Sequence, residues 1–196
     1  MRIYFATIFL AFSLVANIAC PVSGDIVDFF VTGAQGDGLL PGNINPPTTS
    51  TGSGAIGLTG ITFDTNTNIL SVDIKWGSKN GFSDLTGPVT LLHLHGPTPS
   101  APPNNFGEVN PDVLVNLANS LAFNASGTGG GLVDTYFLSN YQEEYLLSGR
   151  TYINVHTQQY PFGEIRGYLL PTAVPEPAAA SLWGVLGLGF GFRRQR

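Results

Sequence analysis

The chain has 196 residues, 11% of them charged, and it contains 25 glycines and 14 prolines. This composition is typical of one turn-rich β domain and argues against a protein of long helices. Residues 25–174 carry 12 acidic and 4 basic side chains, a net charge of −8, so they lack the basic surface that nucleic-acid binding requires. Cys20 is the only cysteine, which excludes an intrachain disulfide.

The first 24 residues have the order of a secretory signal peptide. Arg2 precedes an apolar stretch over residues 3–19, and cleavage after either Ala19 or Gly24 would follow a small residue. The apolar stretch is too short, and too interrupted by polar residues, for a membrane-spanning helix. We therefore expect an exported protein whose first 24 residues are removed.

Short segments rich in β-forming residues follow, separated by clusters of Gly, Pro, Asn and Ser. In residues 68–76, apolar side chains occupy every second position, as in a strand with one buried face. The strands predicted in this way cover residues 26–31, 55–63, 68–76, 88–95, 112–117, 151–157 and 164–170. Residues 41–54 and 97–107 are expected to be long loops. This spacing predicts an all-β domain, an antiparallel sandwich or barrel.

One segment departs from the β pattern. Residues 139–149 have a capping residue at Ser139 or Asn140, Gln142 or Glu143 three positions later, and a glycine at the end. This arrangement predicts a short helix or a helical turn between the strands at 112–117 and 151–157.

The chain's three histidines fall within two of the predicted strands. His93 and His95 alternate with leucines in TLLHLHGP, and His156 alternates with aliphatic residues in TYINVHT. Because alternate side chains of a strand point to opposite faces, an aliphatic core face would leave all three histidines on the outer face, together with Glu164 and Arg166. The expected core residues are Leu92, Leu94, Ile153, Val155, Ile165 and Leu169. A hairpin between the last two strands would place His156 near Glu164.

Three imidazoles and a carboxylate on one face form a candidate site for Zn²⁺ or Cu²⁺, with His93, His95, His156 and Glu164 as ligands. This site requires the strand of His93 and His95 to adjoin the strand of His156, which the sequence leaves open. The alternative is a polar network in which the histidines bond to the backbone and to Glu164, and Arg166 pairs with an acid. Three histidines are too few for a dinuclear copper–zinc dismutase site.

Sequence patterns of common enzymes are absent from the chain. It has no GxSxG, no phosphate-binding glycine loop and no HExxH, and Cys20 lies at the processing site rather than in the body. We therefore expect a protein that is not an enzyme.

The last 25 residues have a distinct order of features. Pro175, Glu176 and Pro177 precede an uncharged segment over residues 178–192, and Arg193, Arg194 and Arg196 follow it. This segment is shorter than the ~20 residues of a spanning helix and is weakened by glycines, so it predicts a short hydrophobic helix that anchors only marginally. The order resembles a PEP-CTERM sorting signal. The resemblance implies a Gram-negative bacterial protein, anchored transiently in the inner membrane and processed by an exosortase-type enzyme.

The body of the chain resembles the CHRD domain, first defined in chordin. The resemblance spans residues 26–170 and implies an immunoglobulin-like or superoxide-dismutase-like antiparallel β-sandwich, without an established biochemical activity. It departs from the family in the wide interval between Gly107 and Ser148, where we expect residues 123–134 to be a local insertion or a mobile loop. The segments that carry it are VTGAQGDGLLPGNINPP, AIGLTGITFDTNTNILSVDIKW, HLHGP, SGRTYINVHT and GEIRGYL.

These observations divide the chain into a signal peptide (1–24), a CHRD β-sandwich (25–171) and a sorting segment (172–196). The first hypothesis is an exported, non-enzymatic module with an adhesive or structural role at the cell envelope or in extracellular polysaccharide. The second is a histidine-rich Zn- or Cu-binding protein, with a redox role left open. A third is a ligand-binder or inhibitor that uses the loops at 97–107 and 160–162.

Overall fold

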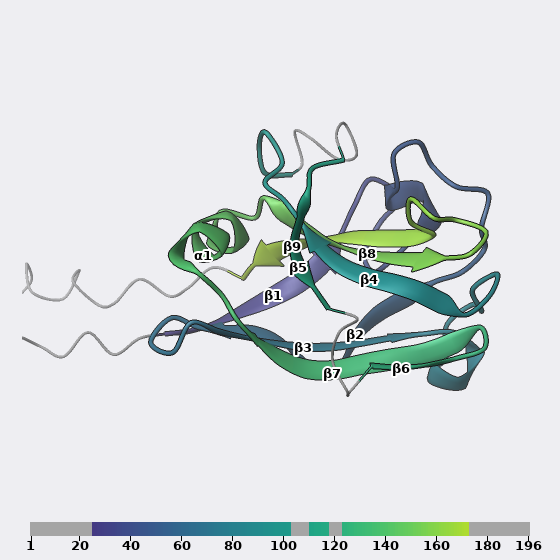
Figure 1. Ribbon diagram of the computed structural model, residues 1–196, viewed down its shortest axis with the longest axis horizontal. Helices are drawn as coiled ribbons and strands as arrows, with labels where there is room; N and C mark the ends of the chain where they lie inside the picture. Colours follow the sequence, from purple (N-terminus) through teal and green to yellow (C-terminus); the bar gives the residue numbers. More distant parts are fainter. Residues whose placement is uncertain (1–24, 103–109, 118–122, 173–196) are drawn as a thin grey trace, which may run out of the picture.

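The computed structural model describes residues 25–102, 110–117 and 123–172. Within these ranges the protein is a curled antiparallel sheet of nine strands with one short helix (Figure 1). The strands are β1 (Ile26–Thr32), β2 (Gly54–Asp64), β3 (Ile69–Trp76), β4 (Val89–His95), β5 (Val113–Asn116), β6 (Phe123–Ser126), β7 (Gly129–Phe137), β8 (Thr151–Thr157) and β9 (Ile165–Pro171). The helix is α1 (Asn140–Leu147), and single 3₁₀ turns lie at Pro41–Asn43 and Ser78–Asn80.

The strand order is β5-β4-β8-β9-β1-β2-β3-β7-β6, and every neighbouring pair is antiparallel. The half with β4, β8 and β9 lies opposite the half with β2, β3 and β7 (Figure 1). β1 joins the halves, because Ile26 to Phe29 pair with β2 and Phe29 to Thr32 pair with β9. The prediction of an antiparallel all-β domain is confirmed. The strands form one continuous half-barrel sheet, however, rather than the two separate sheets of a sandwich, because β1 hydrogen-bonds to both halves.

The sheet bends sharply within β2. The register between β2 and β3 shifts between Ile56 and Ile61, and Gly60 in this interval has a φ of 79° that favours glycine. The Asp73 carboxylate holds the bulge, because its Oδ2 accepts from the backbone N–H of Thr59 at 2.9 Å and from its hydroxyl at 3.0 Å. Lys75 Nζ lies 3.2 Å from Asp73 Oδ1. The bulge therefore gives the curled sheet a fixed bend.

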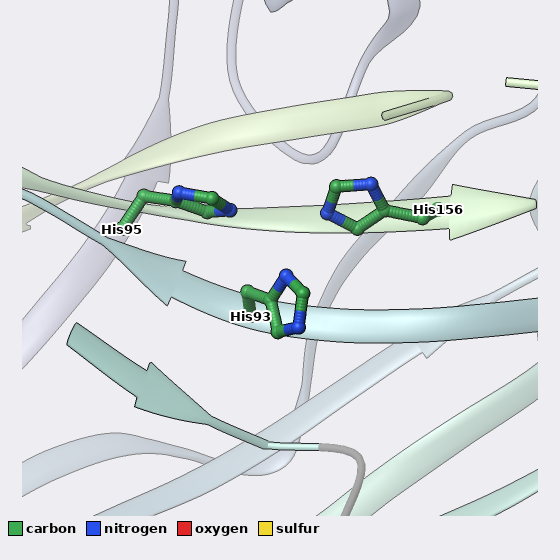
Figure 2. Close-up of side chains that lie close together, drawn as sticks. All are labelled: His93, His95 and His156. Atoms are coloured by element: carbon green, nitrogen blue, oxygen red, sulfur yellow. The ribbon is translucent and has the colours of Figure 1, made fainter. Parts of the chain in front are cut away.

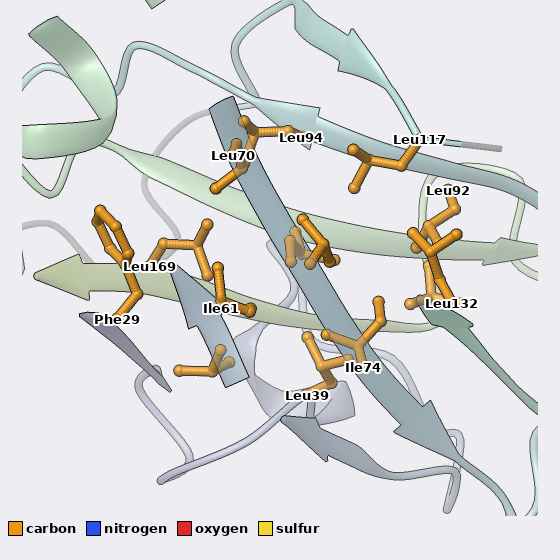
Figure 3. Close-up of a cluster of buried hydrophobic side chains, with 14 of the residues drawn as sticks. Phe29, Leu39, Ile61, Leu70, Ile74, Leu92, Leu94, Leu117, Leu132 and Leu169 are labelled. Atoms are coloured by element: carbon orange, nitrogen blue, oxygen red, sulfur yellow. The ribbon is translucent and has the colours of Figure 1, made fainter. Parts of the chain in front are cut away.

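The hydrophobic core fills the space between the two halves of the sheet (Figure 3). All six aliphatic residues that the strand pattern assigned to the core are fully buried there: Leu92, Leu94, Ile153, Val155, Ile165 and Leu169. The prediction of the core face is therefore confirmed. Burial of these side chains drives the two halves together, because each contributes about 1.5–3 kcal/mol when removed from water.

The opposite face of β8 and β9 is also buried, which corrects the expectation that it faces solvent. His156 is 5% exposed, Arg166 is 1% exposed and Glu164 is fully buried. Residues of two loops contact the side chains of this face: Asn110 Oδ1 accepts from Arg166 Nη2 at 2.6 Å, and the Pro161 carbonyl lies 2.9 Å from His156 Nδ1. Strand alternation predicted two faces correctly, but it carries no information on a loop that packs over one of them.

The helix prediction is confirmed in detail. Ser139 caps α1 by accepting from the N–H of Gln142, and the Gln142 side chain accepts from the N–H of Ser139, which together form a capping box. Gly149 follows the helix with a φ of 68°, the left-handed conformation that ends many helices.

The expectation of a mobile loop at residues 123–134 is wrong. These residues form β6 and most of β7, joined by a tight turn at Gly127, whose φ is 67°. β7 pairs with β3 from Gly130 to Phe137. The three glycines at the start of β7 hide the strand in the sequence. At Gly131 an added Cβ would meet the Lys75 side chain and the Ile74 carbonyl, so a residue without a side chain fits the close packing against β3.

The predicted signal peptide and the sorting segment from residue 173 onward lie outside the described residues. Among the residues that the structure does describe, none forms a helix with the length and hydropathy of a membrane span.

Candidate metal centre

The three histidines converge on two neighbouring strands. His93 and His95 lie on β4 and His156 lies on β8, and these strands pair so that His93 is opposite Asn154 and His156 is opposite Leu91. One ligand nitrogen from each ring lies within 4.8 Å of the other two. Figure 2 shows the three rings grouped over the two strands. The convergence that the sequence left open is therefore present.

Backbone carbonyls fix the tautomers of two of the rings. His95 Nδ1 lies 2.8 Å from the Pro111 carbonyl and His156 Nδ1 lies 2.9 Å from the Pro161 carbonyl. A carbonyl only accepts, so each Nδ1 carries the proton and each Nε2 keeps its lone pair. Metal-ligating histidines characteristically donate their second ring nitrogen in this way. We therefore assign Nε2 as the free nitrogen of both rings.

The free nitrogens are buried without a hydrogen-bond partner. This holds for His93 Nδ1, His95 Nε2 and His156 Nε2 among the described residues. Buried polar atoms of side chains nearly always have a partner, and each exception calls for an explanation such as an ion. Three such nitrogens in one cluster therefore fit a metal ion.

The environment keeps the three imidazoles neutral. Burial lowers the pKa of His93 and His95, and it lowers the pKa of His156 to about 4. The positive charge of Arg166 lowers the pKa of His95 and His156 further. Neutral imidazole is the form that binds metal, so the cluster is ready to bind at pH 7 without losing protons.

An aromatic side chain that the sequence analysis did not single out supports the cluster. The Tyr152 ring stacks on His95 with centroids 5.2 Å apart and planes 11° from parallel. The guanidinium carbon of Arg166 lies 4.0 Å from the centroid of the Tyr152 ring. Tyr152 shares its strand and its face with His156, and this parity was the sequence signal that could have identified it.

Arg166 pairs with no acid of the described residues, contrary to the polar-network alternative. Its Nη2 donates to Asn110 Oδ1 at 2.6 Å, while Nε and Nη1 are buried without a hydrogen-bond partner within the described ranges. The ion pair that the structure does contain in these ranges joins Lys75 and Asp73, in the other half of the sheet.

Glu164 lies opposite His156 in the β8–β9 hairpin, but it is not one of the residues whose ligand atoms converge. Its Oε1 accepts from Ser50 Oγ at 2.6 Å and from the Thr86 N–H at 2.8 Å. Its Oε2 accepts from the hydroxyls of Thr86 at 2.7 Å and Thr157 at 2.6 Å. β9 begins only at Ile165, after Gly163 with a φ of 120°, so strand alternation does not extend to Glu164. Glu164 thus joins the loops that contain Ser50 and Thr86 to Thr157 at the end of β8.

Comparison of the chain with known proteins identifies its family. Residues 38–169 match the family model of the CHRD domain. The chain belongs to the CHRD family. No curated protein and no solved structure gave a significant match.

In this CHRD domain the resembling segments become neighbours in space. HLHGP ends β4, the segment with His156 is β8, and GEIRGYL starts β9, so the three lie side by side in the sheet. Gly167 shows why a glycine ends the GEIRG motif: an added Cβ would run into the Val31 side chain and the Gly38 carbonyl. The CHRD match contains all three histidines, Tyr152 and Arg166.

Proposed function

We propose that this CHRD protein binds a single Zn or Cu ion through His93 Nδ1, His95 Nε2 and His156 Nε2. Two observations carry the proposal: one ligand nitrogen from each of the three rings lies within 4.8 Å of the other two, and each ring has one buried nitrogen without a hydrogen-bond partner among the described residues. Three neutral imidazoles held by two paired strands match the ligand number of known three-histidine zinc sites, which leave the fourth position open.

A purely structural polar network explains the cluster less well. Such a network would bond the histidines to the backbone and to Glu164. Backbone carbonyls do accept from Nδ1 of His95 and His156, but Glu164 accepts from Ser50, Thr86 and Thr157 instead, and one nitrogen of each ring is left without a partner among the described residues. A buried acceptor without a partner costs about 1–3 kcal/mol. Three of them in one place are costly without an ion and are satisfied by one.

Metal analysis of the purified protein tests the proposal. We expect about one equivalent of Zn or Cu after loading and dialysis, and none in the variant with His93, His95 and His156 all changed to Ala. Glu144→Gln, on the exposed face of α1, serves as the folded control. A wild-type protein that binds no metal under saturating conditions, or a triple variant that still binds one equivalent, would contradict the proposal.

We further propose that the protein is exported, held transiently at the inner membrane by its C-terminal segment and processed by an exosortase-type enzyme. Its role would be non-enzymatic, in adhesion or in interactions at the envelope or with exopolysaccharide. The support is the order of features in residues 1–24 and 172–196 and the lack of enzyme motifs in the sequence. Deletion of residues 178–196 should change where the protein is found after cell fractionation, and an unchanged distribution would contradict this proposal.

We also propose that the curled sheet is a variant of the immunoglobulin-like or superoxide-dismutase-like sandwich. The support is that its two halves face each other across one core. An experimental structure in which the halves do not enclose a common core would overturn the relationship.

A further inference from the structure

The candidate metal centre has an unusual balance of charge. The three converging groups are neutral imidazoles, and no carboxylate or thiolate of the described residues joins them. The charged group that bears on the cluster is Arg166, which is 1% exposed. Its guanidinium lies against one side of Tyr152, and His95 stacks on the same ring from the neighbouring strand. The cluster is thus one aromatic ring away from a buried positive charge.

The charge of Arg166 is not offset by a counter-ion in the described structure. Asn110 Oδ1 accepts from Nη2, but this amide is neutral. Glu164 is the buried carboxylate two residues away, and its oxygens are engaged by Ser50, Thr86 and Thr157. The three imidazoles are neutral, so among the described residues the guanidinium of Arg166, which lies against the ring that stacks on His95, is the charge that an ion in the cluster meets. An ion in the cluster therefore meets a repulsive field.

Burial makes this field strong. The three ligand nitrogens and the Nε and Nη1 atoms of Arg166 are all shielded from solvent. The interaction between two charges becomes stronger as the local dielectric constant falls. A buried guanidinium therefore repels a nearby cation more strongly than an exposed guanidinium would. The repulsion and the cost of removing an ion from water both rise with the charge of the ion, and a divalent ion suffers more than a monovalent one.

We propose that the cluster selects Cu(I) over Cu(II) and Zn(II), and that Arg166 is the residue that determines this selectivity. The inference rests on the metal-binding function proposed above and narrows it to one ion. Three imidazole nitrogens can complete the shell of Cu(I), whereas zinc on three histidines takes a water or another ligand in its fourth position. Arg166 acts through its charge and does not touch the ion.

Competition with chelators under anaerobic reducing conditions, together with the midpoint potential of the bound copper, tests the inference. In the wild type we expect Cu(I) to bind more tightly than Cu(II) or Zn(II), so the potential lies above that of the free aqueous couple. Arg166→Met should lower the ratio of Cu(I) to Cu(II) affinity by about tenfold, which is about 59 mV for a one-electron couple. Arg166→Lys keeps the charge and should retain most of the wild-type ratio. Lys79→Met removes an exposed charge in the 3₁₀ turn at Ser78–Asn80 and should leave the ratio unchanged.

A second pair of variants avoids the buried arginine, in case Arg166→Met does not fold. Leu91 is 42% exposed and lies opposite His156 in the β4–β8 register. Leu91→Glu adds a negative charge beside the cluster at a surface position, and Leu91→Gln is its neutral match. The glutamate variant should show a lower ratio of Cu(I) to Cu(II) affinity than the glutamine variant by severalfold.

The outcomes separate the two levels of the proposal. A protein that binds no metal in any oxidation state contradicts the proposed function itself. A protein that binds one metal but prefers Zn(II) or Cu(II) overturns the inference and leaves the function standing. Equal ratios for Leu91→Glu and Leu91→Gln, or for Arg166→Met and Lys79→Met, would also overturn it.

Discussion

Tyr152 and His95 stack across the pair of β8 and β4, with ring centroids 5.2 Å apart and planes at 11°. The stack fixes the plane of the imidazole, while the Pro111 carbonyl fixes its tautomer at 2.8 Å from Nδ1. Together these contacts hold His95 Nε2 toward the cluster before any ion arrives. Such preorganisation lowers the cost of ordering a ligand on binding.

The hydroxyl of Tyr152 adds nothing to this arrangement. It is buried, it has no hydrogen-bond partner among the described residues, and burial raises its pKa to about 12. Tyr152→Phe should therefore leave the free energy of unfolding unchanged or raise it by about 1 kcal/mol, because an unsatisfied buried group is removed. Metal affinity should stay the same. Tyr152→Leu, which removes the ring, should weaken metal binding severalfold. Urea unfolding measures the stability of both variants, and metal titration measures their affinity. A large loss of stability in Tyr152→Phe would show that the hydroxyl has a hydrogen-bond partner.

The stability of the metal-free protein should fall between neutral pH and pH 4. The pKa of His156 falls from 6.5 to about 4 on burial, so in this window the unfolded chain binds a proton that the folded chain does not. The free energy of unfolding is not reduced by His156 above pH 6.5, where the residue is neutral in both states. It falls as the pH falls from 6.5 toward 4, by roughly 3 kcal/mol for this residue. The lowered pKa values of His93 and His95 act in the same direction.

Urea unfolding of the metal-free protein between pH 7.5 and 4.5 measures this dependence. His156→Gln should flatten it by removing the largest part, which separates the histidine from the carboxylates that titrate at lower pH. An equal slope in the wild type and in His156→Gln would show that His156 is not held neutral by the fold.

Glu164→Gln separates an anchoring role from a ligand role. The carboxylate accepts hydrogen bonds from Ser50, from the backbone and hydroxyl of Thr86 and from Thr157, and the amide cannot accept all of them. We expect the free energy of unfolding to drop by about 2–4 kcal/mol, since hydrogen bonds to charged groups contribute about 1.5–3 kcal/mol each. Metal stoichiometry should remain at one equivalent.

The exposed Glu144→Gln is the matched control for this substitution and should change stability by less than about 0.5 kcal/mol. If Glu164→Gln folded normally but bound no metal, Glu164 would be a ligand after all.

The bulge in β2 makes a further prediction about stability. A Cβ on Gly57 would collide with the Asp73 carboxylate and push it away from Thr59 and Lys75. Gly57→Ala should therefore destabilise the protein by about 1–3 kcal/mol. Gly87→Ala is the control, because an added Cβ there meets no atom within 4 Å. Thermal unfolding of both variants provides the comparison, and equal melting temperatures would mean that the bulge does not depend on this contact.

Much of the site could be predicted from the sequence because strand alternation is a local property. Leu92 and Leu94 on one side and His93 and His95 on the other follow from the two-residue period alone, and the structure confirms the buried side. The alternation failed at Glu164, because the residue precedes β9 and directly follows Gly163, whose φ is 120°. β7 also escaped detection, since it begins with three glycines, which have no side chains to form a periodic pattern.

By itself, the sequence determined the β class, the capped helix, the core faces of β4, β8 and β9 and the set of histidines available for a site. These are consequences of backbone geometry and of side-chain polarity within a few residues. Only the tertiary structure decided that β4 and β8 are neighbours, which brings His156 to His93 and His95. It also decided that loops contact the polar face of the sheet and that Arg166 lies beside the cluster without an acidic partner among the described residues. Strand pairing and loop packing are contacts between distant parts of the chain, and they depend on how the whole core closes rather than on local pattern.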